Sequence, residues 1–302
     1  MNERLLVNAA PHMRDRETVS VLMQDVLIAL VPALIASLYF FGLNALTVIL
    51  SCSFSALFFE ALYLKITGKK IAAADIKSAL LTGILLAFCL TPVAPWWMAA
   101  VGSGFAIIFV KHLFGGLGFN IFNPALAARA FLLASWPVLM TTWVRPFDAV
   151  TTATPLAKPI PPLTPLIDLF TGNVGGCLGE TSALALLIGA AYLIYRKAID
   201  LRIPAAYLGT VTVFSLILHL NPMFHLMAGG LMLGAFYMAT DPVTSPTTKM
   251  GRWFFGFGCG ALTMVIRLWG GYPEGVCYAI LLMNAAAPLL DRYTRGKIFG
   301  EK

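Results

Sequence analysis

The chain has 302 residues, of which 59% are hydrophobic and 12% are charged, and its mean hydropathy is +0.82. Soluble domains carry about 25% charged residues, so the composition excludes an ordinary soluble protein and indicates a polytopic membrane protein surrounded by lipid. The formal charge of +7 does not indicate a nucleic-acid partner, because the basic residues lie in short segments beside apolar runs, where they direct membrane topology.

The first 19 residues are more polar than the rest of the chain. They include Arg4, Asp15 and Glu17 and contain no apolar run long enough for a signal peptide. We therefore predict that residues 1–19 form a cytoplasmic N-terminal arm and not a cleaved leader.

The apolar segments that follow are long enough to be membrane spans, since a bilayer core requires about 20 mostly apolar residues per helix. We predict ten spans, at residues 20–41, 43–64, 78–91, 95–114, 122–140, 181–198, 203–220, 224–240, 252–269 and 274–290. The spans at 78–91 and 224–240 are short or interrupted by glycine. The expected fold class is an all-α polytopic membrane protein, with one long polar segment at 141–180.

The distribution of basic residues is an independent test of this topology. With the N-terminus inside, seventeen of the 21 Lys and Arg residues fall on the inner side. Three fall outside (Arg145, Lys158 and Arg267), and Arg129 lies within a span. Basic residues concentrate on the cytoplasmic side of a membrane, so we predict that both termini are cytoplasmic and that segment 141–180 faces outward.

The two halves of the chain resemble each other weakly. Thr91-Pro92 and Asp241-Pro242 each end a span, and a glycine pair (115–116, 270–271) precedes each closing span. Five spans per half would invert the second copy relative to the first, so we predict two inverted repeats of five helices, at 20–140 and 181–302. Folds of this kind place substrate and ion sites where a helix is broken and its backbone groups are free. The alternative is that the glycines only allow close helix packing.

Metal-binding patterns are weak in this sequence. The five cysteines form no C-x-x-C pair and no ferredoxin spacing, and the four histidines form no ligand pattern. We expect no metal or iron–sulfur site held by this chain alone.

A compact hydroxyl cluster lies in segment 141–180. Thr151, Thr152 and Thr154 fall within four residues, with Asp148 ahead and Pro155 behind. These residue types are ordinary in solvated turns. By composition alone the cluster therefore predicts a loop.

Three longer motifs carry a specific resemblance. They are Gly115-Gly116-Leu117-Gly118-Phe119-Asn120-Ile121-Phe122-Asn123-Pro124-Ala125, Ala239-Thr240-Asp241-Pro242-Val243-Thr244-Ser245-Pro246, and Tyr272-Pro273-Glu274-Gly275-Val276. With them, essentially the whole chain resembles the D subunit of the Rnf electron transport complex. That family is related to the B subunit of the sodium-pumping NADH:quinone oxidoreductase.

The resemblance implies FMN joined through its phosphate to a threonine in a Ser/Thr-Gly-Ala-Thr pattern. Here the pattern falls on Thr151-Thr152-Ala153-Thr154, with Thr152 in place of the usual glycine. The implied acceptor is Thr154, with Asp148, Thr151 and Thr152 beside the cofactor. A separate FMN transferase is implied as well, because nothing in this sequence would attach the flavin.

The resemblance to the sodium-pumping relative also suggests a second, non-covalent riboflavin among the helices. We place it near Asn120 and Asn123, because asparagine can both donate to and accept from the pyrimidine edge of a flavin. The alternative is that Asn123 caps a helix that starts at Pro124.

Asp241 is our candidate for ion coupling. A carboxylate at the centre of a membrane helix costs about 2.5–3.5 kcal/mol, so it usually has a partner, and a cation is one. The alternative places Asp241 at the inner interface, solvated and near Lys249 or Arg252.

The expected function is that of a membrane subunit of a Na⁺- or H⁺-translocating ferredoxin:NAD oxidoreductase complex in the bacterial cytoplasmic (inner) membrane. Other subunits would supply the ferredoxin, NAD and iron–sulfur sites, since no G-x-G-x-x-G and no cysteine cluster occurs here. The alternative is an inverted-repeat channel or secondary transporter without a redox role.

Overall fold

The computed structural model describes residues 18–148, 150–157, 164–180, 182–271 and 274–296. Regular structure in these residues is almost entirely helical, and its two strands have only two residues each. One helix in the described part, α1, is both long enough and apolar enough to cross a membrane. Shorter apolar helices are α4, α7 and α8. The predicted helical class is therefore confirmed, whereas the ten spans and the inverted repeat remain predictions.

The described residues of the first half form five α-helices and one π-helix. They are α1 (Val19–Ile66), α2 (Ala73–Phe88), α3 (Trp96–Gly104), η1 (Phe105–His112), α4 (Pro124–Ser135) and α5 (Pro137–Met140). The π-helix η1 continues α3 directly. A π turn is wider than an α turn and occurs often at functional sites.

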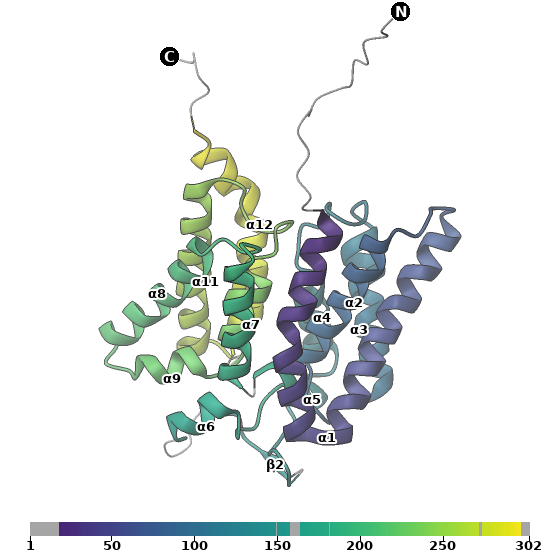
Figure 1. Cartoon of the computed structure of the whole chain (residues 1–302). Helices are drawn as coiled ribbons and strands as arrows, with labels where there is room; N and C mark the ends of the chain where they lie inside the picture. Colours follow the sequence, from purple (N-terminus) through teal and green to yellow (C-terminus); the bar gives the residue numbers. More distant parts are fainter. Residues whose placement is uncertain (1–17, 149, 158–163, 181, 272–273, 297–302) are drawn as a thin grey trace, which may run out of the picture.

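The helix α1 folds back on itself at Gly42, so that its 48 residues form two arms (Figure 1). Gly42 has φ 55° and ψ −133°, a conformation that side-chain-bearing residues rarely adopt. The two arms cover residues 19–41 and 43–66. Glycine thus separates the first two predicted spans.

The segment between the halves contains little regular structure. Its elements are β1 (Trp143–Val144), β2 (Thr151–Thr152), α6 (Leu166–Thr171) and the 3₁₀-helix η2 (Leu178–Glu180). The strands form an antiparallel hairpin in which Trp143 is opposite Thr152 and Val144 is opposite Thr151.

The described residues of the second half form six α-helices and one π-helix. They are α7 (Ala183–Tyr195), α8 (Arg202–Ile217), α9 (Pro222–Met227), α10 (Leu231–Leu233), η3 (Gly234–Met238), α11 (Lys249–Trp269) and α12 (Val276–Thr294). The predicted break in span 224–240 is present, because Gly229 and Gly230 adopt positive φ between α9 and α10. The short span predicted at 78–91 corresponds to α2, which is continuous and ends at Phe88.

Several helices begin where the sequence provides an N-capping residue. Five helices begin after a Ser, Thr or Asn whose side-chain oxygen accepts a backbone N–H of the first turn, namely Thr18, Asn123, Ser182, Asn221 and Thr248. These residues are favoured N-caps because they satisfy N–H groups that have no helical partner.

Small residues bring helices of the two halves close together. The first arm of α1 packs against α7, and α4 packs against α12. At the first of these interfaces Gly189 lies against the Ala29 carbonyl and the Tyr237 hydroxyl, where a Cβ would collide. Close packing at small residues is typical of membrane helices. Gly189 is therefore a close-packing glycine, although it is not one of the repeat glycines for which packing was the alternative.

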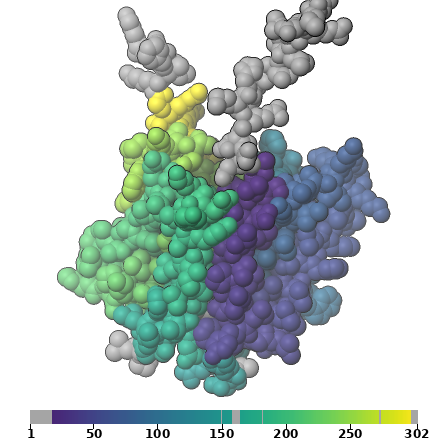
Figure 2. Space-filling view, viewed as in Figure 1, coloured from purple at the N-terminus to yellow at the C-terminus, as the bar shows by residue number. Residues whose placement is uncertain are grey.

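The molecule has two ends (Figure 1). The hairpin and α6 lie at one end, which we call the hairpin end, together with the turn of α1. The start of α1 and the end of α12 lie at the opposite end. Figure 2 shows the green second half against the purple first arm of α1. Large apolar side chains on the surface include Leu43 at 77% exposure and Phe54 at 74%, as a lipid-contacting protein requires.

Candidate functional site

The hairpin places the threonine cluster at the edge of the helical body. Thr151 and Thr152 on β2 are exposed, as is Asp148 in the connecting turn. Thr154 differs from them, because it is 1% exposed and its hydroxyl accepts the Leu156 N–H at 3.3 Å. The four residues therefore lie close together, but the candidate acceptor hydroxyl faces the protein interior.

A buried cluster of charges lies in the same region as the hairpin. Arg129 of α4 contacts Glu274, which precedes α12, and its guanidinium lies 3.8 Å from Glu180 of η2. The Cys177 thiol is 3.6 Å from the Arg129 guanidinium and 3.7 Å from the Glu274 carboxylate. The Cys177 N–H donates to Glu180 at 3.3 Å. All four residues are at least 90% buried, so each charge depends on the others for stabilisation.

Arg267 of α11 stabilises the broken helix in the second half. Its guanidinium donates to the carbonyl oxygens of His225, Ala228, Gly229 and Glu274 at 2.7–3.0 Å. Three of these carbonyls lie at the end of α9, where the helix break leaves them without helical partners. The charge distribution assigned Arg267 to the outer side of the membrane, which stays a prediction, and the structure adds that its side chain is buried at 3% exposure.

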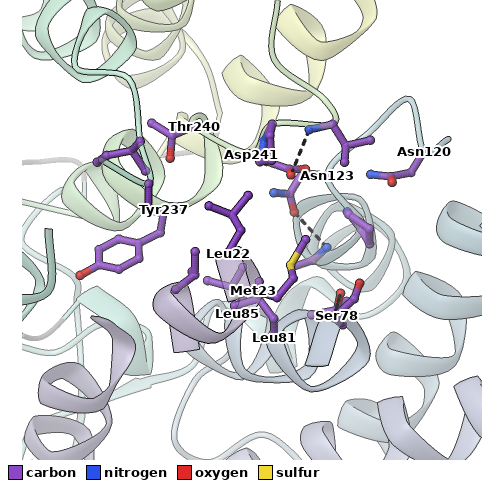
Figure 3. A pocket seen from close by; sticks show the side chains of 18 of the residues that line it. Leu22, Met23, Ser78, Leu81, Leu85, Asn120, Asn123, Tyr237, Thr240 and Asp241 are labelled. Atoms are coloured by element: carbon purple, nitrogen blue, oxygen red, sulfur yellow. Dashed lines mark hydrogen bonds between the residues drawn. The ribbon is translucent and has the colours of Figure 1, made fainter. Parts of the chain in front are cut away.

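A cavity at the opposite end brings together three predicted site residues. Asn120, Asn123 and Asp241 all line it, with walls from the first turns of α1, from the middle and end of α2, and from η3 (Figure 3). The cavity holds about 760 Å³ of unfilled space, its open mouth included. Residues separated by more than 100 positions thus form one site.

The two asparagines have different roles in this cavity. The Asn123 side-chain oxygen accepts the N–H groups of Ala125 and Leu126, and its amide donates to the Met238 carbonyl at 3.4 Å. Helix capping by Asn123 is therefore confirmed. Asn120 donates to the Phe122 carbonyl at 3.1 Å, and none of the described residues donates a hydrogen bond to its side-chain oxygen.

Asp241 lies at the edge of the cavity and is half-buried. Its carboxylate accepts the Val243 N–H at 3.3 Å and the Thr244 hydroxyl at 3.1 Å. Burial raises the pKa of this carboxyl above its usual value, and the two hydrogen bonds oppose the shift only in part. No ion pair links Asp241 to Lys249 or Arg252 among the described residues, and Arg252 pairs with Asp200 instead.

A second buried charge group adjoins this cavity and was not identified from the sequence. The Glu60 carboxylate lies 3.0 Å from both the Lys111 ammonium and the His112 Nε2. Tyr63 stacks on the His112 ring at 3.9 Å between centroids. Lys111 also lines the cavity, so the cation nearest to the predicted riboflavin site is already paired with a carboxylate.

The roles of Arg129, Glu180 and Glu274 were also not identified from the sequence. The sequence did contain a signal for them. Placing a charged residue within or beside a membrane span costs free energy, so such residues are usually paired with an opposite charge. Their partners could not be identified, because they come from three separate elements.

Comparison with known proteins assigns the family. The sequence profile of the NQR2, RnfD, RnfE family matches residues 6–300. The chain belongs to this family. Its relatives include the D subunit of the Na⁺-translocating ferredoxin:NAD⁺ oxidoreductase complex of Acetobacterium woodii, which is 52% identical over 99% of this chain and 97% of the relative.

Two further family members match over nearly their whole length. The D subunit of the proton-translocating ferredoxin:NAD⁺ oxidoreductase complex of Clostridium ljungdahlii is 46% identical, with 98% of this chain and 96% of the relative covered. The D subunit of an ion-translocating oxidoreductase complex of Escherichia coli is 38% identical, with 98% of both chains covered. The resemblance to the Rnf D subunit is thereby confirmed.

Proposed function

We propose that this chain is the D-type membrane subunit of an ion-translocating ferredoxin:NAD⁺ oxidoreductase complex and that it carries FMN esterified to Thr154. The observation that carries this proposal is the near full-length similarity to relatives of that name at 52% and 46% identity. Its partners are the other subunits of the complex, membrane lipid, and a separate FMN transferase.

The residues around Thr154 fit a tethered flavin. Thr154 is 1% exposed, so attachment of a phosphate requires its hydroxyl to turn outward, toward the exposed Thr151 and Thr152. FMN accepts one or two electrons and can connect one-electron with two-electron partners. The chain itself contributes the attachment point, the polar hairpin and the charge cluster of Arg129, Glu180 and Glu274 in the same region.

Flavin fluorescence on a denaturing gel tests this assignment. The purified wild-type chain should fluoresce under ultraviolet light after denaturation, because a phosphoester survives unfolding. Thr154→Ala should abolish the signal, whereas Thr154→Ser should retain it because the hydroxyl is kept. Thr151→Ala and Thr152→Ala serve as matched controls and should stay fluorescent. A fluorescent Thr154→Ala chain would assign the flavin to another residue.

We further propose ten membrane spans in two inverted repeats, with both termini in the cytoplasm and segment 141–180 on the outer face of the bacterial inner membrane. The charge distribution along the sequence supports this orientation. Cysteines introduced at the exposed positions Val150 and Tyr293 should react with membrane-impermeant reagents from opposite sides. Labelling from the same side would contradict the topology.

The cavity at the opposite end supports a second proposal, a non-covalent riboflavin near Asn120. Its walls are mostly apolar, with a few polar groups such as Asn120, Thr240 and Asp241, as is usual for small-molecule sites. Riboflavin released from the purified chain by acid, while FMN remains attached, would support it. Release of no free flavin would exclude it.

The alternative is an inverted-repeat channel or secondary transporter without a redox role. A covalent flavin distinguishes the two functions, because a plain transporter has no use for a redox cofactor. Asp241 would serve as the ion-coupling residue in the first function and as part of the permeation path in the second.

A further inference from the structure

We propose that a pocket between the end of α7, the start of α8 and the first turn of α11 binds the phosphate group of an anionic phospholipid. The pocket is separate from the hairpin and the threonine cluster, so the inference does not depend on a flavin or on a redox role. The pocket holds about 970 Å³ of unfilled space, its open mouth included. Its described lining residues include Ile194, Lys197, Asp200, Leu201, Ile203 and Arg252.

The pocket carries an excess of positive charge. One oxygen of the Asp200 carboxylate accepts hydrogen bonds from both Arg202, at 2.8 Å, and Arg252, at 2.6 Å. The Lys197 side chain is exposed and has no ion-pair partner among the described residues. Three cations therefore surround one carboxylate, which is the only acidic group among the described lining residues. Each guanidinium has further N–H groups with which to bind a phosphate oxygen.

The backbone of Lys197 indicates that its side chain has a role. Lys197 follows the end of α7 with a φ of 56°, in the left-handed region that glycine commonly occupies after a helix. Its N–H donates to the Ile194 carbonyl at 3.0 Å, and the Ala198 N–H donates to the Leu193 carbonyl at 2.9 Å. A residue with a side chain costs about 1–2 kcal/mol in this conformation. The turn alone would favour glycine, whereas lysine places a cation on the pocket wall.

The surroundings of the pocket favour a lipid as the source of the phosphate. Ile194, Leu201 and Ile203 give the pocket an apolar wall, and Leu201 is 50% exposed. Trp253, next to Arg252 in the first turn of α11, is 46% exposed. Exposed tryptophan is typical of the membrane–water interface. A glycerol backbone and the start of an acyl chain can pack on the apolar wall while the phosphate contacts the cations.

The pocket also lies at a suitable depth. The start of α11 is at the end of the molecule opposite the hairpin, since the Thr248 hydroxyl lies 2.5 Å from the hydroxyl of Thr294 near the end of α12 (Figure 1). In the topology proposed above, this end faces the cytoplasm. Basic pockets between membrane helices on that side bind anionic head groups.

Binding of phosphatidylglycerol to the purified full-length chain tests the site. Native mass spectrometry counts the bound lipids as phosphatidylglycerol or phosphatidylcholine is added, and the wild-type chain should bind phosphatidylglycerol more tightly. Lys197→Gln should raise the dissociation constant of the first phosphatidylglycerol about fivefold, because each basic residue near an anionic lipid contributes about 1 kcal/mol. Lys249→Gln is the matched control and should bind as the wild type does. Lys249 is exposed at the start of α11 but does not line the pocket.

Asp200→Asn provides a readout of the opposite sign. Asparagine keeps an oxygen to accept the Arg202 N–H, which donates to Asp200 at 2.9 Å, but it removes the charge that competes with the phosphate. The variant should bind phosphatidylglycerol about fivefold more tightly, and a folding defect would not produce that gain.

Three results would overturn the proposal. The first is equal affinity of the wild-type chain for the two lipids. The second is phosphatidylglycerol binding that Lys197→Gln leaves unchanged or that Asp200→Asn fails to strengthen. The third is displacement of the lipid by millimolar inorganic phosphate, which would assign the pocket to a soluble phosphate compound.

Discussion

The polar groups at the two ends of this protein are stabilised in different ways. At the hairpin end, Arg129 lies between two glutamates, and Arg267 is held by four backbone carbonyls. In the cavity at the opposite end, Lys111 is likewise paired with a buried carboxylate, that of Glu60, but Asp241 is not. Asp241 is the single carboxylate among the described lining residues, and its partners are a backbone N–H and a hydroxyl.

This difference indicates that the two ends have different functions. A buried ion pair is rigid, because breaking it leaves an uncompensated charge in a medium of low dielectric constant. The charges at the hairpin end are therefore held in a fixed arrangement, as are Lys111 and Glu60 beside the cavity. A half-buried carboxylate without a basic partner can exchange a proton or a metal cation, so the cavity is suited to ion binding.

The largest expected effect comes from breaking the charge cluster. Arg129→Ala should lower the free energy of unfolding by about 3–5 kcal/mol, because two buried glutamates lose their cation. Thermal denaturation in detergent measures this loss. The double variant Arg129→Met with Glu274→Gln should recover part of it, because one buried carboxylate is then removed as well. No recovery would show that the ion pair is not what stabilises this region.

Arg267→Gln should destabilise the broken helix by about 3 kcal/mol, because hydrogen bonds to a charged group contribute about 1.5–3 kcal/mol each and glutamine cannot replace all four. Hydrogen exchange should accelerate in residues 225–231 before it changes elsewhere. Uniform acceleration along the whole chain would contradict the local role that we assign to Arg267.

Gly189→Ala tests the contact between the two halves beside the cavity. The new methyl group would collide with the Ala29 carbonyl and the Tyr237 hydroxyl, so the free energy of unfolding should fall by about 1–3 kcal/mol. Gly209→Ala is the matched control in helix α8. Nothing lies within 4 Å of a Cβ at that position, and the variant should be neutral or more stable.

Asp241→Asn should change the free energy of unfolding by no more than about 1 kcal/mol, because asparagine preserves the shape of the side chain and one of its two acceptor oxygens. The effect of the substitution should appear in how the rate of electron transfer depends on cation concentration. In the native chain, the cation concentration needed for electron transfer should rise as pH falls toward the raised pKa of Asp241. The reason is that protons compete with the cation for the carboxylate. The variant should lose this pH dependence while it retains covalent flavin. A pH dependence equal to that of wild type would assign ion coupling to another group.

Local features of the fold could be predicted from the sequence. Gly42 separates the two arms of α1, Asn123 with Pro124 starts α4, and Gly229 with Gly230 interrupts the helix at the position expected from glycine content. These outcomes depend on backbone conformation and capping, which act over a few residues. The short span predicted at 78–91 overlaps α2, a continuous helix in which Gly83 packs against the backbone of Cys52 and Ser53.

The sequence by itself also determined the helical class and the family. Apolar composition and long motifs are properties of the linear sequence and do not depend on which residues are in contact. Only the tertiary structure decided which charges meet. Arg129 of α4, Glu180 of η2 and Glu274 before α12 are far apart in the sequence, and so are Asn120 and Asp241, which lie in connections between helices. Their pairing depends on how helices pack across the two halves, and side-chain spacing along one helix cannot encode it. The buried position of the Thr154 hydroxyl was decided in the same way, by the packing of the hairpin against the helices.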